Sequence, residues 1–333
     1  MNASVIGGGS WGTALAIQLC RAGGRVRMWD RDAARMEIVQ RDRENARYLP
    51  GVRLPDGLEC RGDMAGALDG ADLVVAVVPS QAMREVMQRA ARSIPTDAVV
   101  CCASKGIEQG TLLAMDDVLK QTLPGGFHHR LCALAGPSFA KEVAMGLPTA
   151  VVVGSKDTAA ADLVASAFHE GFFRVYHTDD VVGLELGGAL KNVIAIATGV
   201  ADGIGVGLNA RAAIITRGLA EISRLAVARG ANPLTLAGLG GVGDLVLTCT
   251  GDLSRNRRVG IGLGQGKTLN AILEELGQVA EGVYTAQSAY DLALQTGVAM
   301  PITEQIYKML YEGKPAADAM RDLLSRERRA ERG

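Results

Sequence analysis

Lys191 stands where a charged side chain is unusual. It belongs to the segment 184–194, LELGGALKNVI, which is otherwise almost entirely apolar or small. Gly187 and Gly188, one helical turn earlier, leave room on that face for something other than side chains. A buried lysine must be paired or have an altered pKa, so Lys191 is a candidate for acid–base catalysis. The alternative is a lysine that extends from a buried helix into solvent, and the spacing leaves both open.

A second lysine, Lys105, follows the apolar run 98–103 and precedes Gly106. In open α/β sheets ligands bind beyond the carboxyl ends of strands, which makes a lysine there a candidate ligand contact. The chain has only eight lysines against 27 arginines, so this position is notable, although loop lysines usually face water. The next apolar run ends in AGPSFAKE, where Gly136 and Ser138 could present backbone N–H groups and a hydroxyl to the same ligand.

Polar residues of the second half form another candidate group. Asp244 follows the glycine turn 240–243 and precedes Thr248, so its carboxylate could orient a lysine or a substrate hydroxyl. Ser254 can cap a helix that begins with Arg255 and Asn256, a suitable cradle for a phosphate or an oxyanion. The alternatives are a helix cap at Asp244 and a solvated basic face at 255–258.

The chain opens with a phosphate-binding pattern. A strand-like run leads into GGGSWG at 7–12, and a helical pattern follows at once. Gly7 permits the tight turn, Gly9 allows backbone to approach a pyrophosphate, and Gly12 allows close helix–strand packing. The helix N-terminus offers free N–H groups to the phosphates. In this context the pattern predicts a dinucleotide site.

The second strand ends in Trp29-Asp30-Arg31, where the adenosine ribose should lie. An acidic residue there binds the 2′-hydroxyl of NAD, and an arginine pairs with the 2′-phosphate of NADP. This chain offers both, so the sequence leaves NAD and NADP open. A surface salt bridge is the alternative role for Arg31.

The elements that position these residues change character near residue 180. Before it, buried apolar runs alternate with helical patterns, as in a parallel sheet covered on both faces. The expected strands are 3–6, 25–29, 72–78, 98–103, 131–135, 149–153 and 172–175, and the expected helices between them include 13–21, 81–91, 111–120 and 158–168. After it only helices are expected, at 183–201, 211–229, 269–276, 285–295, 302–311 and 316–326. We therefore expect an α/β chain with a doubly wound, mostly parallel Rossmann-type domain over 1–180, followed by an all-α domain over 181–333 that binds substrate and carries catalytic residues.

Composition excludes several classes of protein. The 333 residues are 48% hydrophobic and 21% charged, with a net charge of −1, which argues against disorder and against a basic nucleic-acid-binding surface. The six cysteines and four histidines lack metal-ligand spacing, so we expect no bound metal. We expect the cysteines to be reduced residues of the hydrophobic core. We expect no signal peptide and no membrane insertion, hence a cytoplasmic protein. The arginine-rich tail 326–332 reads as a solvated helix end or frayed terminus, with a membrane-binding patch as a distant alternative.

Together these segments closely resemble the bacterial NAD(P)-dependent glycerol-3-phosphate dehydrogenase family. The matching blocks run in the family's order from residue 5 to residue 285: VIGGGSWGTA at 5–14, SKGIE at 104–108, GPSFA at 136–140, GLPTA at 146–150, LKN at 190–192, GDLVLT at 243–248, LSRN at 253–256 and EGVYT at 281–285. The glycine loop is shared by many dehydrogenases, whereas GPSFA and LSRN are particular to this family. The resemblance departs at Asp30, because family members mostly carry a small residue there beside a basic one.

The resemblance implies reversible hydride transfer between NAD(P)H and dihydroxyacetone phosphate, giving sn-glycerol 3-phosphate for phospholipid synthesis, in a homodimer. It implies that Lys191 is the general acid and base, and that Lys105 polarises the carbonyl. Further implied catalytic residues are Asn192, Asp244 and Thr248. The implied substrate contacts are Lys105, Gly136, Ser138, Lys191, Asp244, Ser254, Arg255 and Asn256, with the phosphate on the last two. The implied cofactor contacts are Gly7, Gly9, Ser10, Trp11, Gly12, Arg31, Lys105, Ala140, Arg255, Val279 and Glu281.

Two other functions are compatible with parts of this sequence. A related β-hydroxyacid or sugar-acid dehydrogenase would share the doubly wound domain followed by helices. A non-catalytic dinucleotide-sensing regulator would keep the fold but not the chemistry, and the presence of both Lys105 and Lys191 without a basic stripe argues against it.

Overall fold

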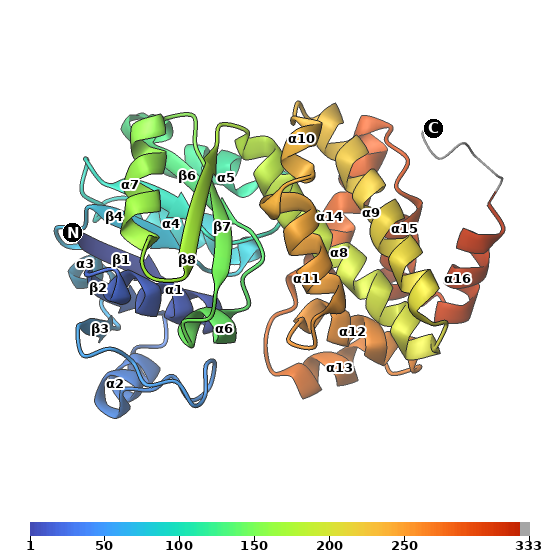
Figure 1. Cartoon of the computed structure of the whole chain (residues 1–333), viewed down its shortest axis with the longest axis horizontal. Coiled ribbons are helices and arrows are strands. Elements are labelled where there is room, and N and C mark those ends of the chain that lie inside the picture. The colour runs from blue at the N-terminus through green and yellow to red at the C-terminus, as the bar shows by residue number, and fades with distance from the viewer. Residues whose placement is uncertain (327–333) are drawn as a thin grey trace.

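The computed structural model describes residues 1–326, and these form a sheet with helices on both faces followed by an all-helical part (Figure 1). The expected fold class is thereby confirmed. The sheet ends with β8 at Thr178, and the first helix of the helical part begins at Val181. The division at residue 180 itself stays a prediction. Most of the charged tail, residues 327–333, lies outside the described residues.

Within residues 1–326, eight strands make one sheet in the order β3-β2-β1-β4-β5-β6-β7-β8. Their bounds are β1 Asn2–Ile6, β2 Arg25–Trp29, β3 Leu58–Arg61, β4 Leu73–Ala76, β5 Val99–Cys102, β6 Leu131–Ala135, β7 Thr149–Gly154 and β8 Phe173–Thr178. All neighbours are parallel except β6 and β7, which are antiparallel. Seven strands were predicted. The edge strand β3 was missed because its four residues alternate buried with partly exposed side chains and include two charges.

Helices cover both faces of this sheet. One face packs against α1 Ser10–Arg21, α2 Ala33–Asp42, α6 Ala140–Ala144 and α7 Thr158–Phe168. The other packs against α3 Met64–Leu68, α4 Met83–Ala90 and α5 Met115–Thr122. Short 3-10 turns, η1 Ser80–Ala82 and η2 Gly125–Arg130, complete the connections. The side chains of β4 alternate between the two cores, with Val75 on one face and Val74 and Ala76 on the other.

The helical part is built around α8 Val181–Ile204, which is buried on nearly all sides. The elements around it are α9 Leu208–Ala228, α10 Pro233–Leu236, the π-type turn η3 Leu239–Gly243, α11 Asp244–Thr250, α12 Arg255–Gly264, α13 Leu269–Leu276, α14 Glu281–Thr296, α15 Pro301–Tyr311 and α16 Ala316–Leu324. The predicted start of α8 at 183 was two residues late, because Asp180 caps this helix by accepting the N–H of Gly183 at 2.9 Å. The predicted helices also left out α10 and α11. The start of α12 at Arg255 follows the predicted cap Ser254, whose hydroxyl accepts the N–H of Arg257.

Two stretches of the helical part have the length and hydropathy of membrane spans. One is α8, in which 89% of the apolar window is buried inside the protein. The other, Pro233–Thr250, is 39% buried and comprises α10, η3 and α11. The burial of α8 identifies it as the core helix of the C-terminal part.

Candidate active site

The glycine turn between β1 and α1 has the geometry that the sequence predicts. Gly7 has a φ of +125°, and a Cβ there would lie 2.3 Å from the carbonyl oxygen of Val77. A Cβ at Gly12 would lie 1.9 Å from the carbonyl oxygen of Gly7, so only glycine lets α1 pack this closely. A Cβ at Gly9, by contrast, would meet no described atom within 4 Å. The turn is therefore tight on the protein side and open on the side that a ligand can approach.

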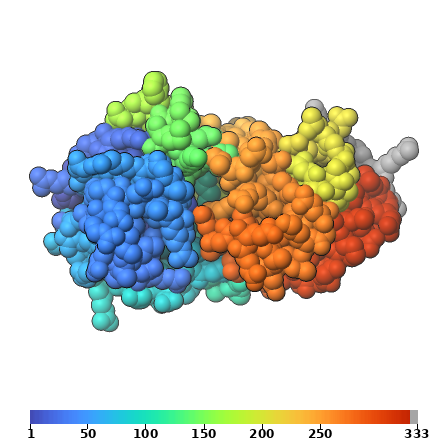
Figure 2. Space-filling view, turned by 90° about the horizontal axis from the view of Figure 1, so that it is seen from below, coloured from blue at the N-terminus to red at the C-terminus, as the bar shows by residue number. Residues whose placement is uncertain are grey.

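A cavity of about 820 Å³ lies between this turn and the helical part. Figure 2 shows the blue N-terminal and orange C-terminal segments on the two sides of a hollow. The glycine turn, the residues after β4 and the loop after β5 line one side, and residues of α8, α12 and the α13–α14 loop line the other. All the predicted site residues line this cavity except Gly136 and Asp244, which lie behind its wall and contact the lysines.

Two lysines from different parts of the chain meet on one carboxylate. Lys105, after β5, places Nζ 2.5 Å from Oδ2 of Asp244, and Lys191, in the middle of α8, places Nζ 2.6 Å from Oδ1. The side chain of Asp244 is 2% exposed and that of Lys191 is 8% exposed. Asp244 is thus neither a helix cap nor a surface residue, and Lys191 does not extend into bulk solvent. The centre carries two positive charges and one negative charge at the wall of the cavity.

Burial and charge act in opposite directions on this centre. Burial lowers the pKa of Lys191 to about 8, with a smaller lowering from the charge of Lys105, while Asp244 opposes the shift. Burial alone would raise the pKa of Asp244, but the two ammonium groups outweigh it, so the pKa of this carboxyl lies below its usual value. Lys191 can therefore gain or lose a proton near neutral pH while Asp244 stays ionised.

Thr248 fixes the direction of the Lys191 ammonium group. Its Oγ1 lies 2.6 Å from Nζ of Lys191 and donates its own proton to the carbonyl oxygen of Asp244, one helical turn earlier in α11. An ammonium group has three N–H donors, and Asp244 and Thr248 take two of them. The third is available to a group in the cavity that Lys191 lines.

Hydrogen bonds also fix the amide of Asn192. The N–H of Gly282 donates to Oδ1 of Asn256 at 2.9 Å, so Nδ2 of Asn256 is the donor to Oδ1 of Asn192, at 2.8 Å. The amino group of Asn192, which lines the cavity, can therefore donate a hydrogen bond to a bound ligand. Asn256 uses one N–H donor and one oxygen lone pair to fix this orientation, which is a larger structural role than the sequence predicted for it.

The turn after β6 supports Lys105. The carbonyl oxygen of Gly136 accepts hydrogen bonds from Nζ of Lys105 at 3.2 Å and from Oγ of Ser138 at 3.0 Å. Gly136 has a φ of +139°, and a Cβ there would lie 2.9 Å from Cα of Val151. A glycine is therefore required where this carbonyl turns toward the lysine.

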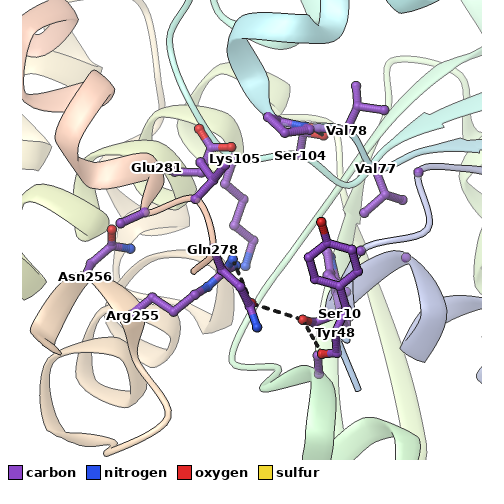
Figure 3. A pocket seen from close by; sticks show the side chains of 18 of the residues that line it. Ser10, Tyr48, Val77, Val78, Ser104, Lys105, Arg255, Asn256, Gln278 and Glu281 are labelled. Carbon is purple, nitrogen blue, oxygen red and sulfur yellow. Dashed lines mark hydrogen bonds between the residues drawn. The ribbon is translucent and has the colours of Figure 1, made fainter. Parts of the chain in front are cut away.

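Side chains from both parts of the chain meet across the cavity in Figure 3. Oε1 of Gln278 lies 3.3 Å from Oγ of Ser10, in the glycine turn, and 3.4 Å from Nη1 of Arg255, in α12. Glu281, at the start of α14, accepts hydrogen bonds from the backbone N–H and the hydroxyl of Ser80. Sequence reasoning missed Gln278 and Ser80. Ser80 could have been found from its place just after β4, whereas nothing in the sequence pattern distinguishes Gln278.

The residues around the glycine turn fit a dinucleotide. Nε1 of Trp11 is buried without a hydrogen-bond partner among residues 1–326, and its ring lines the cavity. The N-terminal N–H groups of α1 have no acceptor within their own helix. The cavity also offers the open face of Gly9 and the guanidinium of Arg255. These donors suit the phosphates of a dinucleotide whose nicotinamide end would reach the lysine centre.

Comparison with known proteins agrees with this site. Residues 2–161 match the family model for the N-terminus of NAD-dependent glycerol-3-phosphate dehydrogenase, and residues 180–321 match the model for its C-terminus. A relative named glycerol-3-phosphate dehydrogenase [NAD(P)+] from Anaeromyxobacter sp. (strain K) is 55% identical over 99% of this chain and 100% of its own length. A relative of the same name from Geobacter sp. (strain M21) is 53% identical over 98% of each chain.

A solved structure extends the comparison to three dimensions. The crystal structure of glycerol-3-phosphate dehydrogenase from Coxiella burnetii superimposes with a TM-score of 0.93 at 39% identity, covering 98% of this chain and 99% of that one. Family models, full-length relatives and this structure agree, and the chain belongs to the NAD-dependent glycerol-3-phosphate dehydrogenase family.

Proposed function

We propose that this chain catalyses reversible hydride transfer between NAD(P)H and dihydroxyacetone phosphate, giving sn-glycerol 3-phosphate, with Lys191 as the general acid. The observation that carries this proposal is the Lys105–Asp244–Lys191 centre, which borders the cavity that also contains the glycine turn. When bound, the reduced nicotinamide supplies the hydride. Every other requirement of the reaction falls to side chains of this chain.

Reduction of a ketone places negative charge on its oxygen, and that charge needs cationic stabilisation and a proton. Lys191 offers its third N–H to this oxygen and gives up the proton as the alkoxide develops. Asp244 holds both ammonium groups in place, so Lys105 can polarise the same oxygen or hold a neighbouring hydroxyl. In the reverse direction the neutral amine of Lys191 takes the proton from the alcohol.

The phosphate of the substrate is assigned to the start of α12. Ser254 caps this helix, and Arg255 and Asn256 follow at its first turn, where helix N–H groups and the guanidinium favour an anion. The amino group of Asn192 faces the same cavity and provides a neutral donor for a substrate oxygen. This arrangement supplies donors and positive charge suited to the phosphate of the substrate.

The setting of the reaction forms part of the same proposal. We infer a homodimer without membrane insertion or nucleic-acid partners, active in the cytoplasm in the supply of glycerol 3-phosphate for phospholipids. The free state of all six cysteines is compatible with a reducing compartment.

A substrate panel tests the proposal. Oxidation of NADPH and NADH is followed by nicotinamide absorbance with dihydroxyacetone phosphate, with unphosphorylated dihydroxyacetone and with a 2-oxo acid. Turnover is expected with the phosphorylated ketone, and a loss of at least about 10²-fold in kcat/KM is expected without its phosphate. Faster turnover of the 2-oxo acid would indicate a hydroxyacid dehydrogenase, and tight NADH binding without any turnover would indicate a regulator.

A further inference from the structure

Two side chains of opposite charge lie at the end of β2, where a Rossmann-type site meets the adenosine ribose. A free carboxylate at this place accepts the ribose hydroxyls of NAD, whereas an arginine pairs with the 2′-phosphate of NADP. Both Asp30 and Arg31 line the cavity. The hydrogen bonds around Asp30 decide which of the two is available to a cofactor.

The carboxylate of Asp30 is already engaged by three donors of the protein. Its Oδ2 accepts the N–H of Gly8, in the glycine turn, at 2.9 Å. Its Oδ1 accepts the N–H of Asp32 at 3.1 Å and lies 2.6 Å from Nη2 of Arg35. A ribose hydroxyl would have to compete with these donors for the remaining lone pairs. Asp30 thus anchors the second glycine of the turn and is a poor ribose acceptor.

Arg35, from the first turn of α2, holds and neutralises this carboxylate. Its side chain is 11% exposed, its Nη1 donates to the carbonyl oxygen of Gly8 at 3.0 Å, and its guanidinium lies 4.7 Å from the ring centre of Tyr48. Gly8 is therefore held by two hydrogen bonds: its N–H donates to Asp30, and its carbonyl oxygen accepts from Arg35. Because the Arg35 guanidinium lies 2.6 Å from Oδ1 of Asp30, its positive charge offsets the negative charge of Asp30 toward the cavity.

Arg31 is differently placed. It is exposed, it lines the same end of the cavity, and it makes no ion pair or side-chain hydrogen bond within residues 1–326. We propose that Arg35 determines cofactor specificity by sequestering Asp30, so that Arg31 meets a 2′-phosphate without an opposing carboxylate and the chain prefers NADPH to NADH. Arg35 is a positioning residue in this account, and Arg31 is the phosphate contact.

The proposal is tested with the full chain and two nucleotides that require no turnover, adenosine 2′,5′-bisphosphate and adenosine 5′-monophosphate. Titration calorimetry is expected to show at least about tenfold tighter binding of the bisphosphate, as one charge-assisted contact supplies. Equal affinities would overturn the proposal. Because neither nucleotide reacts, this result is independent of whether the proposed ketone reduction is correct.

Arg31→Gln is expected to remove most of that difference while monophosphate binding stays within about threefold of wild type. The matched control is Arg41→Gln, which removes the same charge from an exposed side chain of α2 whose ion pair is with Asp42. Arg47 also lines the adenosine end and lies 5.2 Å from the ring centre of Tyr48. A loss of preference in Arg47→Gln but not in Arg31→Gln would contradict the assignment to Arg31.

Arg35→Gln provides the test of positioning. Releasing the Asp30 carboxylate is expected to shift the ratio of the two affinities at least about tenfold toward the monophosphate, and the KM ratio toward NADH. Adding Asp30→Asn should restore the bisphosphate preference, which a merely structural role of Arg35 would not do. A double variant with the same preference as Arg35→Gln alone would overturn the proposal.

Asp30→Asn in the wild-type background decides the matter if Arg35→Gln fails to fold. An amide retains an acceptor for the N–H of Gly8 but loses the charge. Monophosphate and NADH affinities are expected to stay within about threefold of wild type, because Asp30 does not bind ribose in this account. A loss of tenfold or so in both would show that the carboxylate is a ribose ligand and would refute sequestration.

Discussion

Lys191 and Asp244 show how far chemistry can be inferred from single residues. Lys191 was identified because a lysine does not belong on an apolar helix without a partner, and the structure supplies that partner in Asp244, 53 positions later. Arg255 follows a recognisable capping serine. Gln278 and Arg35 carry no comparable signal, since each is an ordinary polar residue until folding brings it to Ser10 or to Asp30. The role of Gln278 depends on a contact 268 positions away, and that of Arg35 also depends on a contact with Gly8, 27 positions away, so neither role can be recognised from a local sequence pattern.

The pKa of Lys191 predicts how the rate of the reaction depends on pH. With a pKa of about 8, the ammonium form needed for ketone reduction is lost above that pH, so kcat/KM for reduction should fall up to tenfold per pH unit there. Oxidation of the alcohol needs the neutral amine and should instead rise up to about that pH. Asp244→Asn removes a charge that supports the ammonium, so both breaks should move to lower pH. Rate profiles in both directions test this, and a reduction rate that stays flat well above pH 8 would contradict it.

The contact between α8 and α12 shows why helices with so many glycines are stable here. A Cβ at Gly199 of α8 would lie 2.1 Å from the carbonyl oxygen of Arg257, and one at Gly260 of α12 would lie 2.0 Å from that of Ile196. The two backbones therefore touch, which places Asn256 beside Asn192. Helical periodicity predicted α8, but it did not predict that the backbones of α8 and α12 touch. A glycine within a helical pattern does not by itself indicate a helix–helix contact, because it can occur there for several reasons.

Gly199→Ala is expected to destabilise the protein by about 2–4 kcal/mol, because backbone atoms on the opposing helix cannot move aside as a flexible side chain could. Gly57→Ala is the matched control, since a Cβ there meets no described atom within 4 Å and its φ is not positive. Thermal and urea unfolding measure both. A Gly199→Ala protein as stable as the control would show that α8 and α12 can separate without cost.

A partly buried carboxyl group, that of Glu185, joins the sheet part to the helical part. Oε1 of Glu185, in α8, accepts the N–H of Asp116 in the first turn of α5 at 2.9 Å, where the N-cap residue Ala114 supplies no side-chain acceptor. The doubly wound architecture and the following helices could be predicted from alternating apolar runs. The hydrogen bond between Glu185 and Asp116 could not be predicted from the sequence, because it depends on how the sheet part and the helical part pack together.

Burial raises the pKa of Glu185 to about 8, and the charges of Asp116 and Asp117 add to the shift. The folded protein thus holds this proton more tightly than the unfolded chain, whose glutamate titrates near 4.5, so stability should fall as the pH rises from about 4.5 to about 8. Glu185→Gln keeps an acceptor without the charge and should reduce this loss by about 1–2 kcal/mol.

Unfolding midpoints of both proteins at about pH 5.5 and about pH 8.5 cover most of the pH range over which the titration of Glu185 changes stability. The glutamine variant is expected to gain on the wild type at the higher pH. Because every other titrating group is common to the two proteins, the difference between them isolates this carboxyl. Parallel pH dependences would show that Glu185 does not carry the effect.

In the proposed mechanism, Lys191 delivers the proton to the substrate oxygen. The most direct measurement is the rate of single-turnover reduction of dihydroxyacetone phosphate by Lys191→Met. Dinucleotide affinity is measured in parallel by nicotinamide fluorescence. The control is Lys156→Met, which changes an exposed lysine outside the cavity. The predicted result is a rate at least about 10²-fold lower, with a dinucleotide Kd within about threefold of wild type. A rate for Lys191→Met equal to that of the control would contradict the account.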